Sequence, residues 1–192
     1  MNTPDAEAAY ASLLDALRSG IGEREVALVG VHSGGAWIAE RLHADLGLSR
    51  ACGFLSTAFH RDDYGRRGHR GLPAGMKATE LPFEVNGADI VLVDDILFTG
   101  RSVRAAINEI FDYGRPARVE LAVLLDRGGR QLPVAADYCG GSFPLSPPSN
   151  YVLSRRWPDE RGSGAGARTS SAGSEGAAAD QRFELRIEAG ET

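Results

Sequence analysis

The stretch IVLVDDILFTGRS, residues 90–102, places two aspartates side by side at the end of an apolar run. Four aliphatic residues precede Asp94 and Asp95, as in a buried parallel strand. Because neighbouring strand residues point to opposite faces, the two like charges need not clash. At the carboxyl end of a strand they would lie in the crevice where open α/β sheets bind ligands.

The turn after the aspartates has the features of a phosphate site. It consists of Thr99, Gly100, Arg101 and Ser102 and leads into a predicted helix, whose first amides and positive end attract an anion. Carboxylates accept hydrogen bonds from sugar hydroxyls, so the stretch predicts a sugar-phosphate ligand. A bare Asp-Asp pair is more often a turn former and helix cap. The aliphatic run before it and the Thr-Gly-x-Ser after it favour a ligand site.

Strands and helices alternate on both sides of this stretch. Apolar or β-branched runs predict strands near residues 26–31, 51–57, 88–95, 118–127, 136–140 and 150–156. Helices are predicted from Thr3-Pro4-Asp5 to Gly20, from Gly34 to Gly47, and before Gly114. The third helix has an apolar face of Val103, Ala106, Ile107, Ile110 and Phe111. The order predicts an α/β fold, a mostly parallel open sheet with helices on both faces.

The composition is that of one soluble globular domain. The 192 residues are 43% hydrophobic, and the formal net charge of -5 gives no general attraction to nucleic acid or anionic membranes. The N-terminus carries acids without an apolar core, and no apolar run reaches the ~20 residues that span a bilayer. We therefore expect a cytoplasmic protein. Cys52 and Cys139 lack metal-binding spacing and are predicted to be buried free thiols.

Two segments depart from the alternation. Residues 60–80 are polar, charged and glycine-rich, and so long a loop in a compact domain is usually functional or disordered. Residues 157–181 are rich in Gly, Ala and Ser and cannot bury a core. We interpret them as a flexible insertion between a domain of residues 1–156 and a returning terminal strand, residues 182–188, of the same domain.

Residues 90–102 resemble the phosphoribosyl-pyrophosphate (PRPP) signature of the type I phosphoribosyltransferases. The flanking segments HRDDY, LPFEVNGADIVLVDDILFTGRSVRAA and YGRPARVELAVLLDRGGRQLPVAADYCG narrow the resemblance to the PyrR family, pyrimidine-operon regulators with uracil phosphoribosyltransferase activity. The similarity runs over residues 10–156. It implies a type I phosphoribosyltransferase-like fold with a small hood, and a homo-oligomer.

The resemblance also implies roles for individual residues. Asp94 and Asp95 would be catalytic and hold the ribose hydroxyls of PRPP, with Thr99, Gly100, Arg101 and Ser102 on its 5′-phosphate. The pyrophosphate loop would comprise His32, Ser33, Gly34 and Gly35. A mobile loop around Arg61, Asp62 and Asp63 would close over the site, and Asp126, Arg127, Cys139 and Gly140 would lie where uracil is read. Mg²⁺ would accompany PRPP, bound through its oxygens and by Asp94 and Asp95 rather than by a dedicated set of protein ligands.

The pyrophosphate loop departs from the family pattern. Where many members have Thr-Arg-Gly, this chain has Ser33-Gly34-Gly35 and lacks a guanidinium that would clamp pyrophosphate. This difference predicts weak PRPP binding, and it predicts that Gly34→Arg tightens it.

Three functions remain open from the sequence. The first is a uracil phosphoribosyltransferase, making UMP, that also binds pyr leader mRNA. The second is a non-catalytic nucleotide sensor that binds RNA, and the third is a phosphoribosyltransferase for another base, such as hypoxanthine or orotate. Basic residues that could contact RNA gather in two places, first Arg61, Arg66, Arg67, His69 and Arg70, and second Arg101, Arg104, Arg115 and Arg118.

Overall fold

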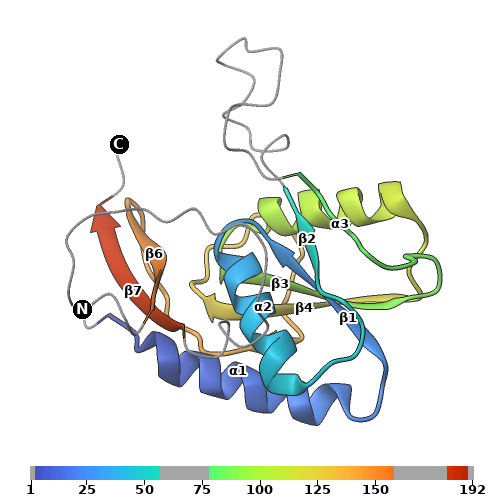
Figure 1. The fold of residues 1–192 in the computed structure, drawn as a ribbon. Helices are drawn as coiled ribbons and strands as arrows, with labels where there is room; N and C mark the ends of the chain where they lie inside the picture. Colours follow the sequence, from blue (N-terminus) through green and yellow to red (C-terminus); the bar gives the residue numbers. More distant parts are fainter. Residues whose placement is uncertain (1–2, 57–77, 158–180, 190–192) are drawn as a thin grey trace.

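The computed structural model describes residues 3–56, 78–157 and 181–189. Within these ranges the elements follow in the order α1 (Ala6–Ile21), β1 (Val26–Val31), α2 (Gly34–Leu46), β2 (Gly53–Leu55), β3 (Asp89–Leu97), α3 (Arg101–Tyr113), β4 (Arg118–Asp126), β5 (Tyr138–Cys139), β6 (Ser149–Arg156) and β7 (Arg182–Ala189). The predicted alternation of strands and helices is confirmed (Figure 1).

Five strands form a parallel sheet in the order β2-β1-β3-β4-β5. The strand that carries the two aspartates, β3, pairs with β1 on one side and β4 on the other. It is the central strand, so its carboxyl end lies in the middle of the row of strand ends. All six residues of β1 are buried, as a strand covered on both faces requires. The predicted parallel α/β sheet is confirmed.

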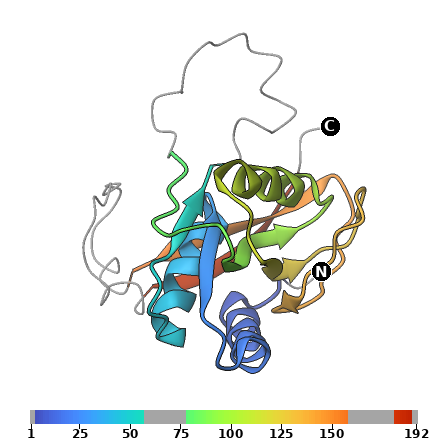
Figure 2. The same cartoon turned by 90° about the vertical axis from the view of Figure 1, so that its right-hand side faces the viewer.

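The helices cover both faces of the sheet, because alternate strand residues face opposite sides. Leu28 and Val91 pack with α1 and α2 in one core. Leu92 and Val123 pack with α3 in the other. Figure 2 shows α3 above the sheet and α1 below it.

The last two described strands form a separate antiparallel hairpin, β6–β7, with Arg156 opposite Arg182. Leu153, Phe183 and Leu185 from this hairpin are buried in the core that α1 and α2 share. The hairpin lies on the side toward which β3 and β4 point (Figure 1), and it corresponds to the expected hood.

Some local predictions were wrong. The first helix begins one residue after Asp5, whose carboxylate caps the amides of Glu7 and Ala8, so Pro4 precedes the helix instead of opening it. It also passes through Gly20 and ends at Ile21, and Gly22, with a positive φ of 58°, caps it. Phe111, expected on the apolar face of α3, is 41% exposed.

The two cysteines are free, as predicted, but each is only partly buried. Burial raises the pKa of the Cys52 thiol to about 12, so this thiol stays protonated near neutral pH. In the described part of the chain, no helix is long and apolar enough to span a membrane.

Candidate active site

The two aspartates leave the end of β3 in different directions. Asp94 is 7% exposed, and its Oδ1 accepts a hydrogen bond from the Asp95 backbone amide at 3.0 Å. The Oδ1 of Asp95 accepts from the Ile96 amide at 2.9 Å, and its Oδ2 faces Gly34. The two carboxylates therefore lie on different sides of β3, with Asp95 against the start of α2, as the alternation of strand side chains predicts.

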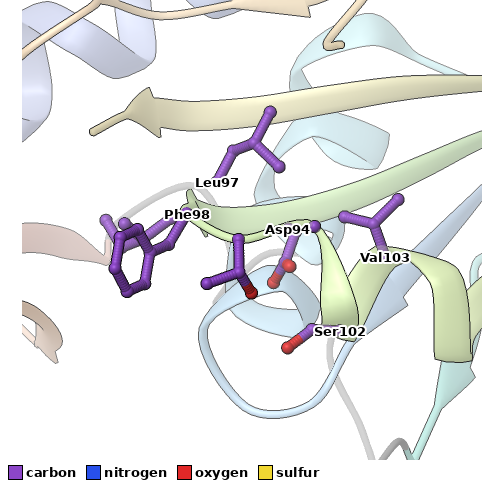
Figure 3. Close-up of a pocket in the computed structure, with 8 residues that line it drawn as sticks. Asp94, Leu97, Phe98, Ser102 and Val103 are labelled. Atoms are coloured by element: carbon purple, nitrogen blue, oxygen red, sulfur yellow. The ribbon is translucent and has the colours of Figure 1, made fainter. Parts of the chain in front are cut away.

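Asp94 lines a hollow at the junction of β3 and α3. The hollow is lined by Asp94, Ile96, Leu97, Phe98, Thr99, Gly100, Ser102 and Val103. Figure 3 shows the Asp94 carboxylate and the Ser102 hydroxyl on the same side of the turn. A carboxylate and a hydroxyl-bearing turn thus line one hollow.

The start of α3 is suited to an anion. The residue before the helix, Gly100, has a positive φ of 87° and no capping side chain, and the first turn contains no acidic residue. The Thr99 hydroxyl accepts the Arg101 amide at 3.3 Å, while the helix ladder begins with the Arg104 amide bonding to Gly100. The Ser102 and Val103 amides lie in the first turn, where amides lack intrahelical partners. Arg101 is exposed.

The predicted pyrophosphate loop lies next to Asp95. It follows β1, has a cis peptide bond between His32 and Ser33, and opens α2 without a side-chain cap. The His32 ring stacks on Phe54 with centroids 5.6 Å apart. A Cβ built on Gly34 would lie 2.1 Å from Asp95 Oδ2, so the loop touches the second aspartate.

This contact argues against the prediction that Gly34→Arg tightens PRPP binding. Every side chain starts with a Cβ, and at position 34 that atom would also lie 2.6 Å from Asp95 Cγ. An arginine would displace the carboxylate before its guanidinium could reach a ligand. The glycine is therefore matched to the position of Asp95, and it is more than the absence of a clamp.

The residues predicted to read uracil lie beside the hollow and do not line it. Asp126 pairs with Leu97 in the ladder between β3 and β4. The Arg127 side chain is buried and donates to Asn150 Oδ1 at 2.9 Å, to Leu145 O at 3.0 Å and to Ser149 O at 2.9 Å. Its guanidinium lies over the Phe98 ring at 3.9 Å, and burial lowers its pKa. Arg127 thus links β6 to Phe98, the residue just before the turn of residues 99–102.

Cys139 and Gly140 do not line the hollow either. A Cβ on Gly140 would lie 2.4 Å from Ala9 O and 2.5 Å from Leu124 O, so this glycine permits close packing against α1 and β4. The Cys139 thiol donates to Gly141 O at 3.3 Å.

Sequence reasoning missed Arg130, which contacts the backbone on both sides of the site. Its signal was present in the acid-base spacing of Asp126 and Arg130, four residues apart in the segment DRGGR. The predicted closing loop of Arg61, Asp62 and Asp63 lies outside the described residues. Among the described residues, no group of three or more His, Cys, Asp and Glu side chains could hold a metal ion.

Comparisons with known proteins agree with this geometry. Residues 2–145 match the family described as phosphoribosyl transferase domain, and the chain is a phosphoribosyltransferase. Two solved structures share the fold. A hypoxanthine-guanine phosphoribosyltransferase from Bacillus anthracis has 16% identity and a TM-score of 0.54, and the match covers 74% of this chain and 84% of that one. A hypoxanthine phosphoribosyltransferase of Trypanosoma cruzi has 19% identity and a TM-score of 0.51, and the match covers 73% of this chain and 79% of that one. At these identities the likeness concerns the fold alone.

Two curated relatives are closer in sequence. The "Bifunctional protein PyrR" of Ralstonia nicotianae is 53% identical over 167 residues, which cover 85% of this chain and 91% of the relative. The protein of the same name from Nitrosococcus oceani is 44% identical over 163 residues, covering 80% and 90%. The chain belongs to the PyrR family, as the resemblance of residues 90–102 and their flanks indicated.

Proposed function

We propose that this protein transfers the 5-phosphoribosyl group of PRPP to uracil, giving UMP and pyrophosphate. The observation that supports this most directly is the hollow shared by Asp94 and the start of α3. The choice of uracil rests on the PyrR relatives. The hypoxanthine-type structures do not argue for a purine, because they share only the fold.

Each part of the site has a task in this proposal. The turn of residues 99–102 binds the 5′-phosphate with its amides and hydroxyls. Asp94 and Asp95 accept hydrogen bonds from the ribose hydroxyls, and the loop of residues 32–35 borders the pyrophosphate. The end of β4, next to the turn, and the end of β5, which pairs with β4, hold the base.

The reaction needs no protein nucleophile. The bond between ribose C1 and a pyrophosphate oxygen breaks, the bond to uracil N1 forms, and the N1 proton leaves to solvent. Positive charge develops on the ribose as pyrophosphate departs, and the Asp94 and Asp95 carboxylates stabilise that charge.

Magnesium fits this site through the substrate. The described residues offer Asp94 and Asp95 at the sheet edge and no three-ligand protein cluster, which suits an ion that keeps several waters and binds one or two carboxylates together with phosphate oxygens. When bound, Mg²⁺ would neutralise charge on the leaving pyrophosphate. PRPP and UMP are intracellular metabolites, so we place the protein in the cytoplasm.

The proposal is tested by incubating the protein with PRPP, Mg²⁺ and one base at a time, and by measuring the nucleotide formed. We expect UMP from uracil and little product from hypoxanthine, guanine or orotate. Preferred turnover of any other base would overturn the assignment of uracil and leave phosphoribosyl transfer intact.

RNA regulation is a second candidate function, favoured by the word "bifunctional" in the relatives' names and by exposed arginines near α3. These arginines are Arg101, Arg104, Arg115 and Arg118. Their charge is partly engaged, since Arg118 pairs with Glu120 at 3.4 Å and Arg115 binds its own helix end. The other predicted basic cluster, within residues 61–70, lies outside the described residues.

Gel shifts with the organism's own pyr leader RNA test this second function. If it holds, UMP tightens the complex and affinity falls steeply with salt, because phosphate contacts release counterions. Arg115→Glu with Arg118→Glu, compared with Arg66→Glu, Arg67→Glu and Arg70→Glu, locates the RNA surface. Absence of UMP-dependent binding would leave a phosphoribosyltransferase alone.

A further inference from the structure

The loop after β4 contacts the turn of residues 99–102, here called the phosphate turn. The Gln131 and Leu132 amides donate to Thr99 O at 3.0 and 3.1 Å. The side chain of Val134 lies 3.2 Å from the position that a Cβ on Gly100 would take. A segment more than 30 residues later in the chain therefore holds the turn at the Thr99 carbonyl and leaves little room for a side chain on Gly100.

Arg130 is the central side chain of this segment. Its Nη1 donates to Phe98 O at 2.8 Å and to Leu97 O at 3.2 Å, the last two carbonyls before the turn. Its Nε donates to Val134 O at 3.1 Å, and its Nη2 binds the Asp126 carboxylate, whose other oxygen accepts the Gly128 amide at 2.8 Å. One guanidinium thus joins the phosphate side of the site to the end of β4, where the proposed base region begins.

The bonds made by Arg130 require a guanidinium. Its donors form a rigid planar fork that reaches four carbonyls, of Leu97, Phe98, Gly128 and Val134, and the Asp126 carboxylate in fixed directions. A lysine ammonium is a point charge on a flexible stem. The side chain is 23% exposed, so the bonds to carbonyls are largely shielded from competing water. Without it, the Leu97 and Phe98 carbonyls would lose a charged donor just where the turn begins.

We propose that Arg130 is a positioning residue that fixes the phosphate turn for the 5-phosphoribosyl group. It does not line the hollow, and it acts through the Leu97 and Phe98 carbonyls. The inference rests on the proposed use of the turn for a 5′-phosphate, but not on which base is the acceptor.

Arg24 provides a matched structural control. It also makes several bonds, to Asp89 at 3.3 Å, to Glu120 at 2.8 Å and to the Gly20 and Ile21 carbonyls. Its side chain is 27% exposed, close to the value for Arg130. It lies before β1 and contacts the start of β3, at the amino-terminal ends of the strands, whereas the phosphate turn follows the carboxyl end of β3.

The test compares Arg130→Met, Arg130→Lys and Arg24→Met by thermal unfolding and by calorimetric titration with PRPP and with ribose 5-phosphate. We expect Arg130→Met to weaken both ligands on the order of 10- to 100-fold, as a misplaced binding group does, and Arg130→Lys to recover little. Arg24→Met should lower the melting temperature by a similar amount and leave both affinities unchanged.

Steady-state kinetics add a second readout. In Arg130→Met, the KM for PRPP should rise much more than the KM for the base. Wild-type affinity for ribose 5-phosphate in Arg130→Met would overturn the inference, as would an equal loss in Arg24→Met. Ribose 5-phosphate binding involves no base. If the wild-type protein binds ribose 5-phosphate but makes no UMP, the uracil assignment is refuted and the role of Arg130 stands.

Discussion

Replacing Gly34 by alanine should disable the site while leaving the fold intact. The new Cβ would lie 2.1 Å from Asp95 Oδ2, 2.6 Å from Cγ and 2.9 Å from Cβ. Ordinary carbon contacts are about 3.5–4.0 Å, so the carboxylate must retreat by more than about 1 Å. The displaced carboxylate is the far end of a side chain at the edge of the site, and the contact with Asp95 Cβ requires only a small shift of the backbone.

A displacement of this size has a predictable cost. Misplacing a binding group by about 1 Å costs up to 100-fold in catalysis, which corresponds to about 2.7 kcal/mol at 1.36 kcal/mol per tenfold. Stability should change little, because alanine has a higher helix propensity than glycine, and this gain offsets part of the strain at Asp95. Gly34 begins α2 without a positive φ, so its backbone accepts alanine.

The assay measures kcat/KM for PRPP and the melting temperature of Gly34→Ala, with Gly35→Ala as the contrast. A Cβ on Gly35 would meet backbone, Val93 O at 2.4 Å and Asp94 Cα at 2.9 Å, so this variant should unfold or melt much earlier. Gly34→Arg should lose PRPP affinity as Gly34→Ala does. A Gly34→Ala protein within twofold of wild type, or a Gly34→Arg protein that binds PRPP more tightly, would refute the reasoning.

Three further predictions concern Asp94, the segment of residues 157–181 and Glu7. Asp94→Asn keeps the Oδ1 that accepts the Asp95 amide but loses the charge facing the ribose, so kcat should fall on the order of 10²–10³ at an unchanged melting temperature; near-normal turnover would make the aspartate a structural turn residue. We propose that residues 157–181 interrupt a single domain. Deleting residues 162–179 leaves seven residues (157–161 and 180–181) to join Arg156 to Arg182, which are paired across the hairpin. The deletion should change activity and melting temperature little, and a large fall in melting temperature would contradict this proposal. Burial raises the pKa of Glu7, but hydrogen bonds from Arg41 and the Phe183 amide outweigh this effect, and the net pKa is lowered. Glu7→Gln should therefore lower the free energy of unfolding by about 2 kcal/mol at pH 7. Urea unfolding should show this difference shrinking as the pH falls below 4.5 and through the lower pKa of the folded state.

The sequence predicted the sheet and the phosphate turn because both depend on local patterns. A run such as VALVGV is apolar at every position, and only a strand covered on both faces buries it completely. The Asp-Asp pair and the Thr-Gly-Arg-Ser turn lie within one stretch, so the strand end and helix start that bring them together are local as well.

Contacts between distant segments could not be read in this way. The fit of Gly34 against Asp95 joins residues about 60 positions apart, and from the sequence alone the glycine looked like a missing clamp. Arg127 was expected near the base, but its buried guanidinium fastens the hairpin through Asn150 and two carbonyls. Phe111 belongs to the apolar pattern of α3, yet at the edge of the helix it stays exposed and contacts Arg115.

Competition between PRPP and UMP tests the central claim most directly. Both present a 5′-phosphate on ribose, so in the proposed site both must use the turn of residues 99–102 and the hydroxyl-binding aspartates. We predict that PRPP with Mg²⁺ binds at one site per chain in a calorimetric titration, and that saturating UMP abolishes or strongly weakens this binding. Undiminished PRPP binding in the presence of UMP, or no PRPP binding at all, would contradict the account.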